Sequence, residues 1–289
     1  MSFEASELIL NSDQSIYHLN LHPEDIAETV ILVGDPGRVA RVSAYFDSLE
    51  VEKSKREFVT HTGWYRGKRL SVVSTGIGTD NVDIVINELD ALVNIDFQKR
   101  KVKKNLTRFN LIRLGTSGAI QPDIPVGSIV LSDLAIGFDG LLQFYDSAKI
   151  QLADVQFAFL EYSGWSVLKP VPYVVQADPE LCERLNSEAV IKGFTATNSG
   201  FYGPQGRSLR LALEDPKINQ KLTAFRHQGL RITNMEMETA GIFGLAALLG
   251  HAATAVNCIL ANRPNGTFSS EPAKEVDRLI RYTLDKLTS

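Results

Sequence analysis

The sequence is poor in cysteine, which limits both its covalent structure and its chemistry. Its 289 residues include only two cysteines, Cys182 and Cys258, and both lie among apolar residues. Two cysteines cannot build the disulfide framework of a small secreted domain. The first residues, MSFEASELIL, include acidic side chains and lack the basic start of a secretory signal. We therefore expect a cytoplasmic protein in a reducing compartment.

A strong excess of charge is also missing. The formal net charge is -4 at pH 7, whereas proteins that bind nucleic acids or anionic membranes without other specificity are usually basic. We expect neither of these partners. The basic stretch 98–108, QKRKVKKNLTR, is the exception. It lacks interleaved aromatic residues, so we interpret it as a solvated loop or helix end instead of a phosphate-binding patch.

Only one hydrophobic run approaches the length of a membrane span, residues 241–261, GIFGLAALLGHAATAVNCILA. Gly250 and His251 interrupt it near the middle, and Asn257 lies near its end. Polar interruptions of this kind are costly in a bilayer. The pattern predicts a buried helix that stops at a glycine, followed by a buried strand.

The remaining pattern is typical of a soluble α/β protein, with 44% hydrophobic and 22% charged residues. Strand-like runs are predicted at 29–34, 57–65, 70–75, 111–116, 127–136, 193–200, 230–237 and 253–260. Helical periodicity is found at 79–94 and 271–287, whereas 146–172 has no clear period and is predicted to contain irregular structure. Alternating strands and helices favour a parallel or mixed sheet covered on both faces. No linker rich in proline, glycine or serine divides the chain, so we predict one domain over residues 1–289.

Three glycine-containing motifs follow or span predicted strands: VGDPGR at 33–38, STGIG at 74–78 and RLGTSGA at 113–119. Each could be an ordinary turn. However, ligands of open α/β sheets bind beyond the carboxyl ends of strands, where glycine admits a close backbone approach. The chain has no Walker A sequence and no complete dinucleotide fingerprint. Arg38, Arg113 and Thr116 instead suit a small tetrahedral oxyanion such as phosphate.

Two more motifs could complete a site. NMEMET at 234–239 places Glu236 and Glu238 between a strand and an apolar helix. They could cap that helix, or accept hydrogen bonds from the hydroxyls of a sugar. FYGPQGR at 201–207 brings an aromatic ring, an amide and a guanidinium together. It is either a simple glycine-proline loop or a surface that stacks on and hydrogen-bonds a planar heterocycle.

With the short segments REF at 56–58 and LANR at 260–263, these motifs form an ordered set of seven. The set resembles the nucleoside phosphorylase family, from about Tyr17 to the last helix, and is most similar to the uridine phosphorylases. The resemblance implies a single-domain three-layer α/β/α sandwich with a central mixed β-sheet. Residues 1–16 would be an amino-terminal extension, and the basic stretch 98–109 looks like an insertion relative to compact members.

The resemblance also implies roles for individual residues. The phosphate-binding positions are Gly34, Arg38, Arg113 and Thr116, with Arg56 reaching in from a neighbouring subunit. The ribose-binding positions are Glu236, Met237 and Glu238, with His18 approaching across the same interface. The base-binding positions are Phe201, Gln205, Arg207 and Arg263. The catalytic groups among them would be Arg38, Arg113, Glu238, Gln205 and Arg207.

The implied reaction is the reversible phosphorolysis of a pyrimidine nucleoside, uridine, to uracil and ribose 1-phosphate in nucleoside salvage and catabolism. Inorganic phosphate is then a co-substrate, and neither a cofactor nor a catalytic metal is expected. Because sites would be shared between subunits, the smallest active unit implied is a dimer, and the family commonly forms hexamers. No nucleic acid or membrane partner is implied.

The sequence departs from the family pattern in places. The base loop reads Tyr-Gly-Pro-Gln-Gly-Arg, where enteric uridine phosphorylases have Tyr-Pro-Gly-Gln-Glu-Arg. Bacterial relatives can hold potassium with positions matching Glu57, Ile77 and a serine, and this chain has Asn81 at the serine position, so potassium is in doubt.

Rival functions remain open. A purine nucleoside phosphorylase of the bacterial hexameric type would place an aspartate where this chain has Asn262. A hydrolytic nucleosidase would generally lack the phosphate arginines. A nucleoside-binding protein without catalysis is a third alternative.

Overall fold

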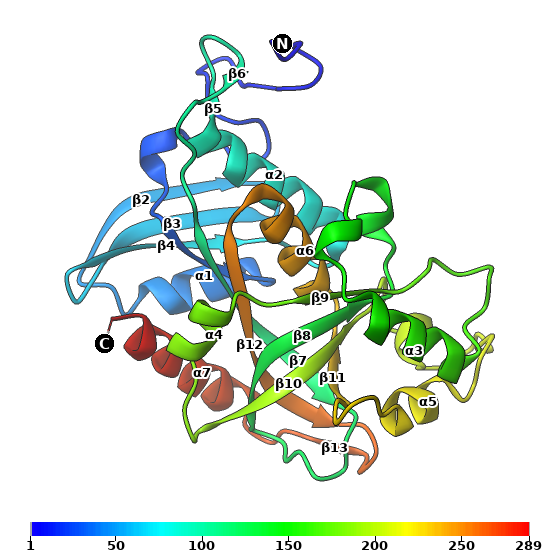
Figure 1. The fold of residues 1–289 in the computed structure, drawn as a ribbon. Coiled ribbons are helices and arrows are strands. Elements are labelled where there is room, and N and C mark those ends of the chain that lie inside the picture. Colours follow the sequence, from blue (N-terminus) through cyan, green and yellow to red (C-terminus); the bar gives the residue numbers. More distant parts are fainter. Residues whose placement is uncertain (1, 289) are drawn as a thin grey trace.

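The computed structural model describes residues 2–288 (Figure 1). The strands are β1 (Thr29–Val33), β2 (Ser48–Lys55), β3 (Phe58–Tyr65), β4 (Lys68–Ser74), β5 (Ile95–Asp96), β6 (Lys101–Val102), β7 (Asn110–Ala119), β8 (Ile129–Gly137), β9 (Tyr173–Gln176), β10 (Val190–Thr197), β11 (Ile232–Glu236), β12 (Ala252–Asn262) and β13 (Thr267–Phe268). The α-helices are α1 (Pro36–Ser43), α2 (Thr79–Asn94), α3 (Ala153–Ser163), α4 (Pro179–Arg184), α5 (Ile218–Ala224), α6 (Thr239–Leu249) and α7 (Pro272–Thr288). Short 3-10 helices lie at Pro23–Asp25, Leu141–Phe144, Ala148–Ile150 and Gly203–Gln205.

Most strands form one mixed sheet of 11 strands with the order β13-β12-β8-β10-β11-β7-β1-β4-β3-β2, and β9 pairs with β8. Strand β7 also pairs with β12, so β12, β8, β10, β11 and β7 close into a ring. Strand β1 is parallel to both β4 and β7. The carboxyl ends of these parallel strands therefore meet at one edge, where α/β proteins usually bind ligands.

Helix α1 lies below the open part of the sheet and α2 above it in Figure 1, whereas α6 packs against α2, β12 and β8, and α7 packs against β12 and β7. Strand β1, TVILV, is buried at every position, as expected for a central parallel strand. Helix α2 turns Val82, Val85, Ile86 and Leu89 into the core. The predicted α/β sandwich with a central mixed sheet is therefore confirmed.

All the predicted strands and both predicted helices are present, with ends shifted by a few residues. The apolar run 241–261 divides as expected into α6 and β12, with Gly250 at φ 83° as the helix stop. No described helix is both long and apolar enough to cross a membrane. The segment 146–172 contains irregular structure as predicted, mainly at 164–172, and also the unpredicted helix α3. That helix buries only Val155, Phe159 and Ser163, so its apolar periodicity is weak.

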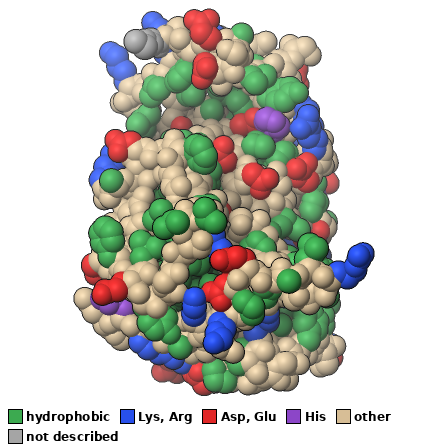
Figure 2. Space-filling model, turned by 90° about the vertical axis from the view of Figure 1, so that its right-hand side faces the viewer, with side chains coloured by type: hydrophobic (Ala, Val, Ile, Leu, Met, Phe, Trp, Pro, Cys, Tyr) green, Lys and Arg blue, Asp and Glu red, His purple; other side chains and the backbone are tan. Residues whose placement is uncertain are grey.

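The basic stretch supplies the turn and the second strand of the β5–β6 hairpin and packs against the amino-terminal segment, beside which it lies in Figure 1. The Arg100 guanidinium donates hydrogen bonds to the carbonyl oxygens of Phe3 at 2.7 Å and Glu4 at 2.7 Å, and also contacts that of Leu8. In the space-filling view, basic side chains lie among acidic and hydrophobic ones and do not form one strip on that face (Figure 2). That these two segments are an extension and an insertion stays a prediction.

Candidate active site

A cavity of about 700 Å³ lies at the carboxyl ends of β1, β4, β7 and β11. Residues from distant parts of the chain line it: Gly34, Asp35, Pro36, Arg38, Glu57, Gly76, Ile77, Asn81, Arg113, Thr116, Ser117, Gly118, Phe201, Gln205, Arg207, Met235, Glu236, Met237, Glu238, Leu260, Ala261 and Phe268. This volume suits a molecule of nucleoside size together with a small anion.

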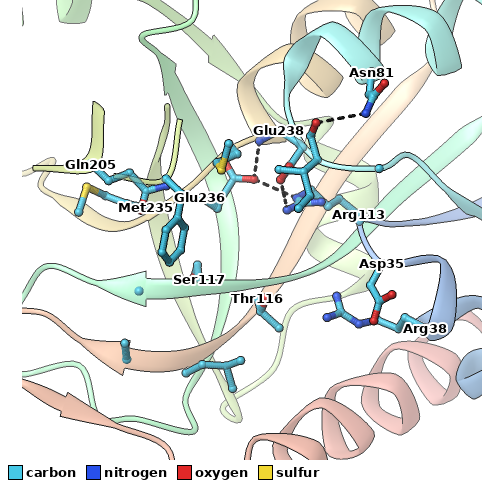
Figure 3. A pocket seen from close by; sticks show the side chains of 18 of the residues that line it. Asp35, Arg38, Asn81, Arg113, Thr116, Ser117, Gln205, Met235, Glu236 and Glu238 are labelled. Carbon is cyan, nitrogen blue, oxygen red and sulfur yellow. Dashed lines mark hydrogen bonds and ion pairs between the residues drawn. The ribbon is translucent and has the colours of Figure 1, made fainter. Parts of the chain in front are cut away.

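The GDPGR motif forms the start of α1. Asp35 is the N-cap residue, and its carboxylate accepts a hydrogen bond from the backbone N–H of Gly37 at 2.9 Å. Pro36 occupies the first turn, where its missing N–H costs nothing. This local structure holds Arg38 in the first turn of the helix, directed into the cavity (Figure 3).

Arg113, on β7, is the buried centre of the site. Its Nε lies 2.9 Å from Glu236 Oε2, and its Nη2 contacts Glu238 Oε2 (Figure 3). Burial disfavours the charge of Arg113, but the two carboxylates outweigh burial and raise its pKa. The guanidinium is therefore held as a fixed cation, with Nη1 left buried and without a partner among the described residues.

Arg38 brings a second positive charge to the same region. Its Nη1 donates only to the carbonyl oxygen of Leu114, at 3.3 Å, and its Nε is buried without a partner among residues 2–288. Burial and the nearby charge of Arg113 lower the pKa of Arg38. Buried donors normally find partners, so two guanidinium groups with unused N–H groups indicate a site for an anion.

The two carboxylates of NMEMET have different environments. Glu236 already accepts from four groups: the Thr197 hydroxyl, the backbone N–H groups of Glu238 and Thr239, and Arg113. Glu238 accepts from Arg113 and from the backbone N–H of Gly78, at 2.8 Å for the latter. Burial raises the pKa of Glu238. Glu238 therefore keeps more capacity to accept hydrogen bonds from a ligand.

The loop 201–207 forms the opposite wall. Gln205 is only 3% exposed, and its Oε1 accepts from Arg207 Nη1 at 2.6 Å. Its amide nitrogen makes no hydrogen bond to any described residue, so it is available to a ligand. The Arg207 guanidinium lies 3.8 Å from the centre of the Phe201 ring. Burial, reinforced by the nearby Arg263, lowers the pKa of Arg207 to about 10.

Ten of the predicted site residues therefore line one cavity, whereas Arg56, His18 and Arg263 do not. Arg263 supports the loop from behind, donating to the carbonyl oxygen of Gln205 at 3.1 Å. Arg56 is exposed at the tip of the β2–β3 hairpin, next to the lining residue Glu57, with φ 55°. His18 pairs through Nδ1 with Glu88 at 2.6 Å. The geometry of one chain does not bring Arg56 and His18 to the cavity.

Sequence reasoning missed several lining residues. Ser117 and Gly118 belong to the RLGTSGA motif, and Met235 belongs to NMEMET. Their position beside predicted site residues could have indicated that they line the cavity. Phe268 had no such signal. It reaches the cavity because β13 folds back on β12, pairing Phe268 with Ala261, and it stays 68% exposed at the mouth.

The positions that the family resemblance matches to a potassium site, Glu57, Ile77 and Asn81, lie together at the edge of the cavity. Asn81 Nδ2 donates a hydrogen bond to the carbonyl oxygen of Ile77 at 3.2 Å. A Cβ at Gly76 would lie 2.5 Å from the same nitrogen and 3.2 Å from Glu57 Cγ, so both side chains pack against Gly76. The carbonyl oxygen of Ile77, which a cation would need as a ligand, therefore already accepts a hydrogen bond from the Asn81 amide.

Comparison with known proteins agrees with this geometry. The family profile described as the phosphorylase superfamily matches residues 28–287. A uridine phosphorylase of Thermococcus kodakarensis is 31% identical over 265 residues, covering 90% of this chain and 82% of that protein. A DeoD-type purine nucleoside phosphorylase of Bacillus velezensis is 29% identical and covers 83% of this chain and 84% of that protein.

Among solved structures, a Trypanosoma brucei nucleoside phosphorylase described as showing uridine phosphorylase activity superposes with a TM-score of 0.86. It is 29% identical and the match covers 97% of this chain and 99% of that one. Profile, sequence and structure matches all extend over nearly the whole length, and none is confined to one motif. The chain therefore belongs to the phosphorylase superfamily.

Proposed function

We propose that this protein is an enzyme that cleaves uridine with inorganic phosphate, giving uracil and ribose 1-phosphate. The observation that carries the proposal is that two guanidiniums, Arg38 and Arg113, line one cavity together with Glu238 and the Gln205 loop, and that each keeps an N–H group without a partner among the described residues. Similarity to uridine phosphorylases of known sequence and structure supports the choice of nucleoside.

Phosphate would bind between Arg38 and Arg113, with the backbone of Gly34 and the Thr116 hydroxyl as further donors. Glu238 would accept hydrogen bonds from the ribose hydroxyls, and Met237 would pack on the sugar. A phosphate oxygen then forms a bond to C1′ while the C1′–N1 bond breaks. The electron pair of that bond leaves with uracil, whose anion takes up a proton from solvent. No side-chain nucleophile is needed, because catalysis relies on positioning and preorganised charge.

Gln205 has the right groups for a pyrimidine edge. Its amide presents an oxygen to accept from N3–H and a nitrogen to donate to a neighbouring carbonyl oxygen of uracil. Arg207 would donate to the other carbonyl oxygen, and Phe201 would lie beside the ring. Asn262, at the position of the purine-binding aspartate, donates both amide hydrogens to the carbonyl oxygens of Gln121 and Ile124. It therefore has no donor left for a purine.

Two further parts of the proposal concern assembly and location. Arg56 is exposed beside the cavity mouth, and we propose that it and His18 complete the site of a neighbouring copy. The functional unit would then be a homodimer or a hexamer built from dimers. We propose a cytoplasmic location, in keeping with two buried free cysteines.

The proposed reaction predicts release of uracil from uridine only when phosphate is present. Uridine, thymidine, inosine and adenosine are incubated with and without phosphate, and the free base is measured by chromatography. Turnover of inosine in preference to uridine would overturn the pyrimidine assignment. Cleavage that does not need phosphate would identify a hydrolase, and saturable uridine binding without turnover would identify a binding protein.

We further propose that the Asn81 amide stands in place of a monovalent cation. The wild type should show the same kcat/KM in sodium, potassium and tetramethylammonium phosphate at equal ionic strength. The N81S variant should gain a dependence on potassium, because the substitution frees the Ile77 carbonyl oxygen. Potassium activation of the wild type would contradict the assignment.

A further inference from the structure

Each strand of the closed ring contributes one polar side chain to a single buried chain of hydrogen bonds. The members are Asn257 of β12, Ser132 of β8, Thr195 of β10, Asn234 of β11 and Ser117 of β7. The successive donor–acceptor distances are 3.3 Å, 2.7 Å, 3.1 Å and 3.0 Å. The first four side chains are at most 2% exposed. Ser117, which is 8% exposed, opens onto the cavity.

The donors and acceptors of this hydrogen-bond chain follow one direction, from Asn257 to Ser117. Hydroxyls of Thr195 and Thr233 lie at 3.1 Å and 2.7 Å from Asn234 Oδ1, which places the amide nitrogen of Asn234 toward Ser117. An amide nitrogen can only donate. The lone pair of Ser117 Oγ therefore receives this hydrogen bond, and its own proton must point elsewhere. Among the described residues no acceptor lies within hydrogen-bond distance of it.

The neighbours of Ser117 along β7 show which part of the cavity surrounds its hydroxyl. Thr116, on one side along β7, lines the cavity and is one of the proposed phosphate donors. A Cβ added at Gly118, on the other side, would lie 3.8 Å from Cγ of Arg263, the residue that supports the base loop. In the close-up, Ser117 lies between Thr116 and the Gln205 loop (Figure 3). Ser117 thus lies between the residues proposed to bind phosphate and those proposed to bind the base.

We propose that the five-strand chain fixes Ser117 as a hydrogen-bond donor to the base as the bond to C1′ breaks, with Asn234 as its positioning residue. The inference rests on the proposed phosphorolysis. Cleavage of the C1′–N1 bond leaves negative charge on the base, spread over N1 and the carbonyl oxygens. A donor whose orientation is set before the reaction stabilises this charge without reorganisation.

The test compares S117A, S117T and N234D with uridine and 5-fluorouridine. Loss of one donor should lower kcat for uridine about 10- to 100-fold in S117A, whereas S117T keeps the hydroxyl and most of the activity. The loss should be smaller with 5-fluorouridine, because its base leaves more easily as an anion. Equal losses with both substrates, or a change confined to the KM for phosphate, would overturn the role at the base.

N234D tests the positioning residue while keeping Ser117. The ionised carboxylate that this substitution introduces accepts the Ser117 proton, so kcat should fall to about the level of S117A, and S117A/N234D should be no slower than either single variant. Protonation of the new carboxyl restores a donor, so the ratio of N234D to wild-type activity should rise as the pH falls. Additive losses or a flat ratio would contradict the mechanism.

Folding is checked by thermal unfolding, with T62V as the matched control. Thr62 is fully buried and hydrogen-bonded to Ser71 at 2.6 Å, but it lies on β3, away from the cavity. T62V should lose stability and keep kcat. If the wild type cleaves uridine and S117A is unimpaired, this inference fails while the proposed function stands. If the wild type does not cleave uridine, the proposed function fails first.

Discussion

Replacing Arg113 with methionine is expected to remove both activity and a large part of the stability. The substitution leaves Glu236 and Glu238, each 4% exposed, without the cation between them. Removing one partner of a buried ion pair typically costs about 3–5 kcal/mol. Loss of a preorganised donor at the reacting phosphate lowers kcat by about 100- to 1,000-fold. Urea denaturation and steady-state kinetics measure the two effects separately.

The stability loss of R113M should depend on pH in a defined direction. Burial already raises the pKa of Glu238 in the presence of Arg113, and removing the cation raises that pKa further. At neutral pH the folded variant must hold a charged carboxylate that the unfolded chain leaves in water. At lower pH Glu238 is protonated, so the difference in unfolding free energy from wild type should shrink.

Second variants separate stability from catalysis. R113M/E238Q should recover part of the lost unfolding free energy, because a neutral amide replaces the stranded carboxylate, and it should remain inactive. R41M removes an exposed arginine whose one side-chain hydrogen bond among the described residues runs from Nη2 to the carbonyl oxygen of Ala273, so it should match wild type in both assays. A stable and active R113M would show that Arg113 is neither structural nor catalytic.

Much of the site was predictable because its residues sit where strands end. The GDPGR, STGIG and RLGTSGA motifs follow or span strands whose apolar runs are plain in the sequence, and parallel pairing of β1 with β4 and β7 brings those ends together. That Arg38 and Arg113 would line one cavity could therefore be predicted without coordinates. The pairing of Arg113 with both carboxylates could not be predicted, since it depends on how β11 meets β7.

Other features depend on contacts that local pattern does not encode. Strand β2, SLEVEKSK, is largely exposed, so it lacks the apolar signal of a core strand. Closure of the ring requires β12 to pair with both β7 and β8, and no sequence period reports such a double pairing. The hydrogen-bond chain from Asn257 to Ser117 crosses four strand pairings, β12–β8, β8–β10, β10–β11 and β11–β7, each between residues far apart in the sequence. Because these pairings are not visible in the sequence, no role could be predicted for Asn234, although it is the first residue of the NMEMET motif.

Replacing Arg38 with methionine is expected to have the largest effect on phosphate affinity. Unlike R113M, R38M should not lower the unfolding free energy. No described carboxylate forms an ion pair with Arg38, and burial together with Arg113 lowers its pKa. Charging this group therefore costs more in the folded protein than in the unfolded chain, so at neutral pH R38M should be as stable as wild type or more stable. Charge-assisted hydrogen bonds contribute about 1.5–3 kcal/mol each, so the KM for phosphate should rise about 10- to 150-fold.

A thermal shift assay joins the two effects of R38M in one measurement. A ligand that binds only the folded state stabilises it by RT ln(1 + [L]/Kd), so phosphate should raise the unfolding temperature of wild type. At the same concentration it should hardly change that of R38M. R38K keeps a positive charge but loses the planar guanidinium that can donate to two phosphate oxygens. Its phosphate-induced shift in unfolding temperature should therefore lie between those of wild type and R38M. A phosphate shift in R38M equal to that of wild type would mean that the anion binds elsewhere, and that the buried Nε of Arg38 stays unpartnered in the bound state as well.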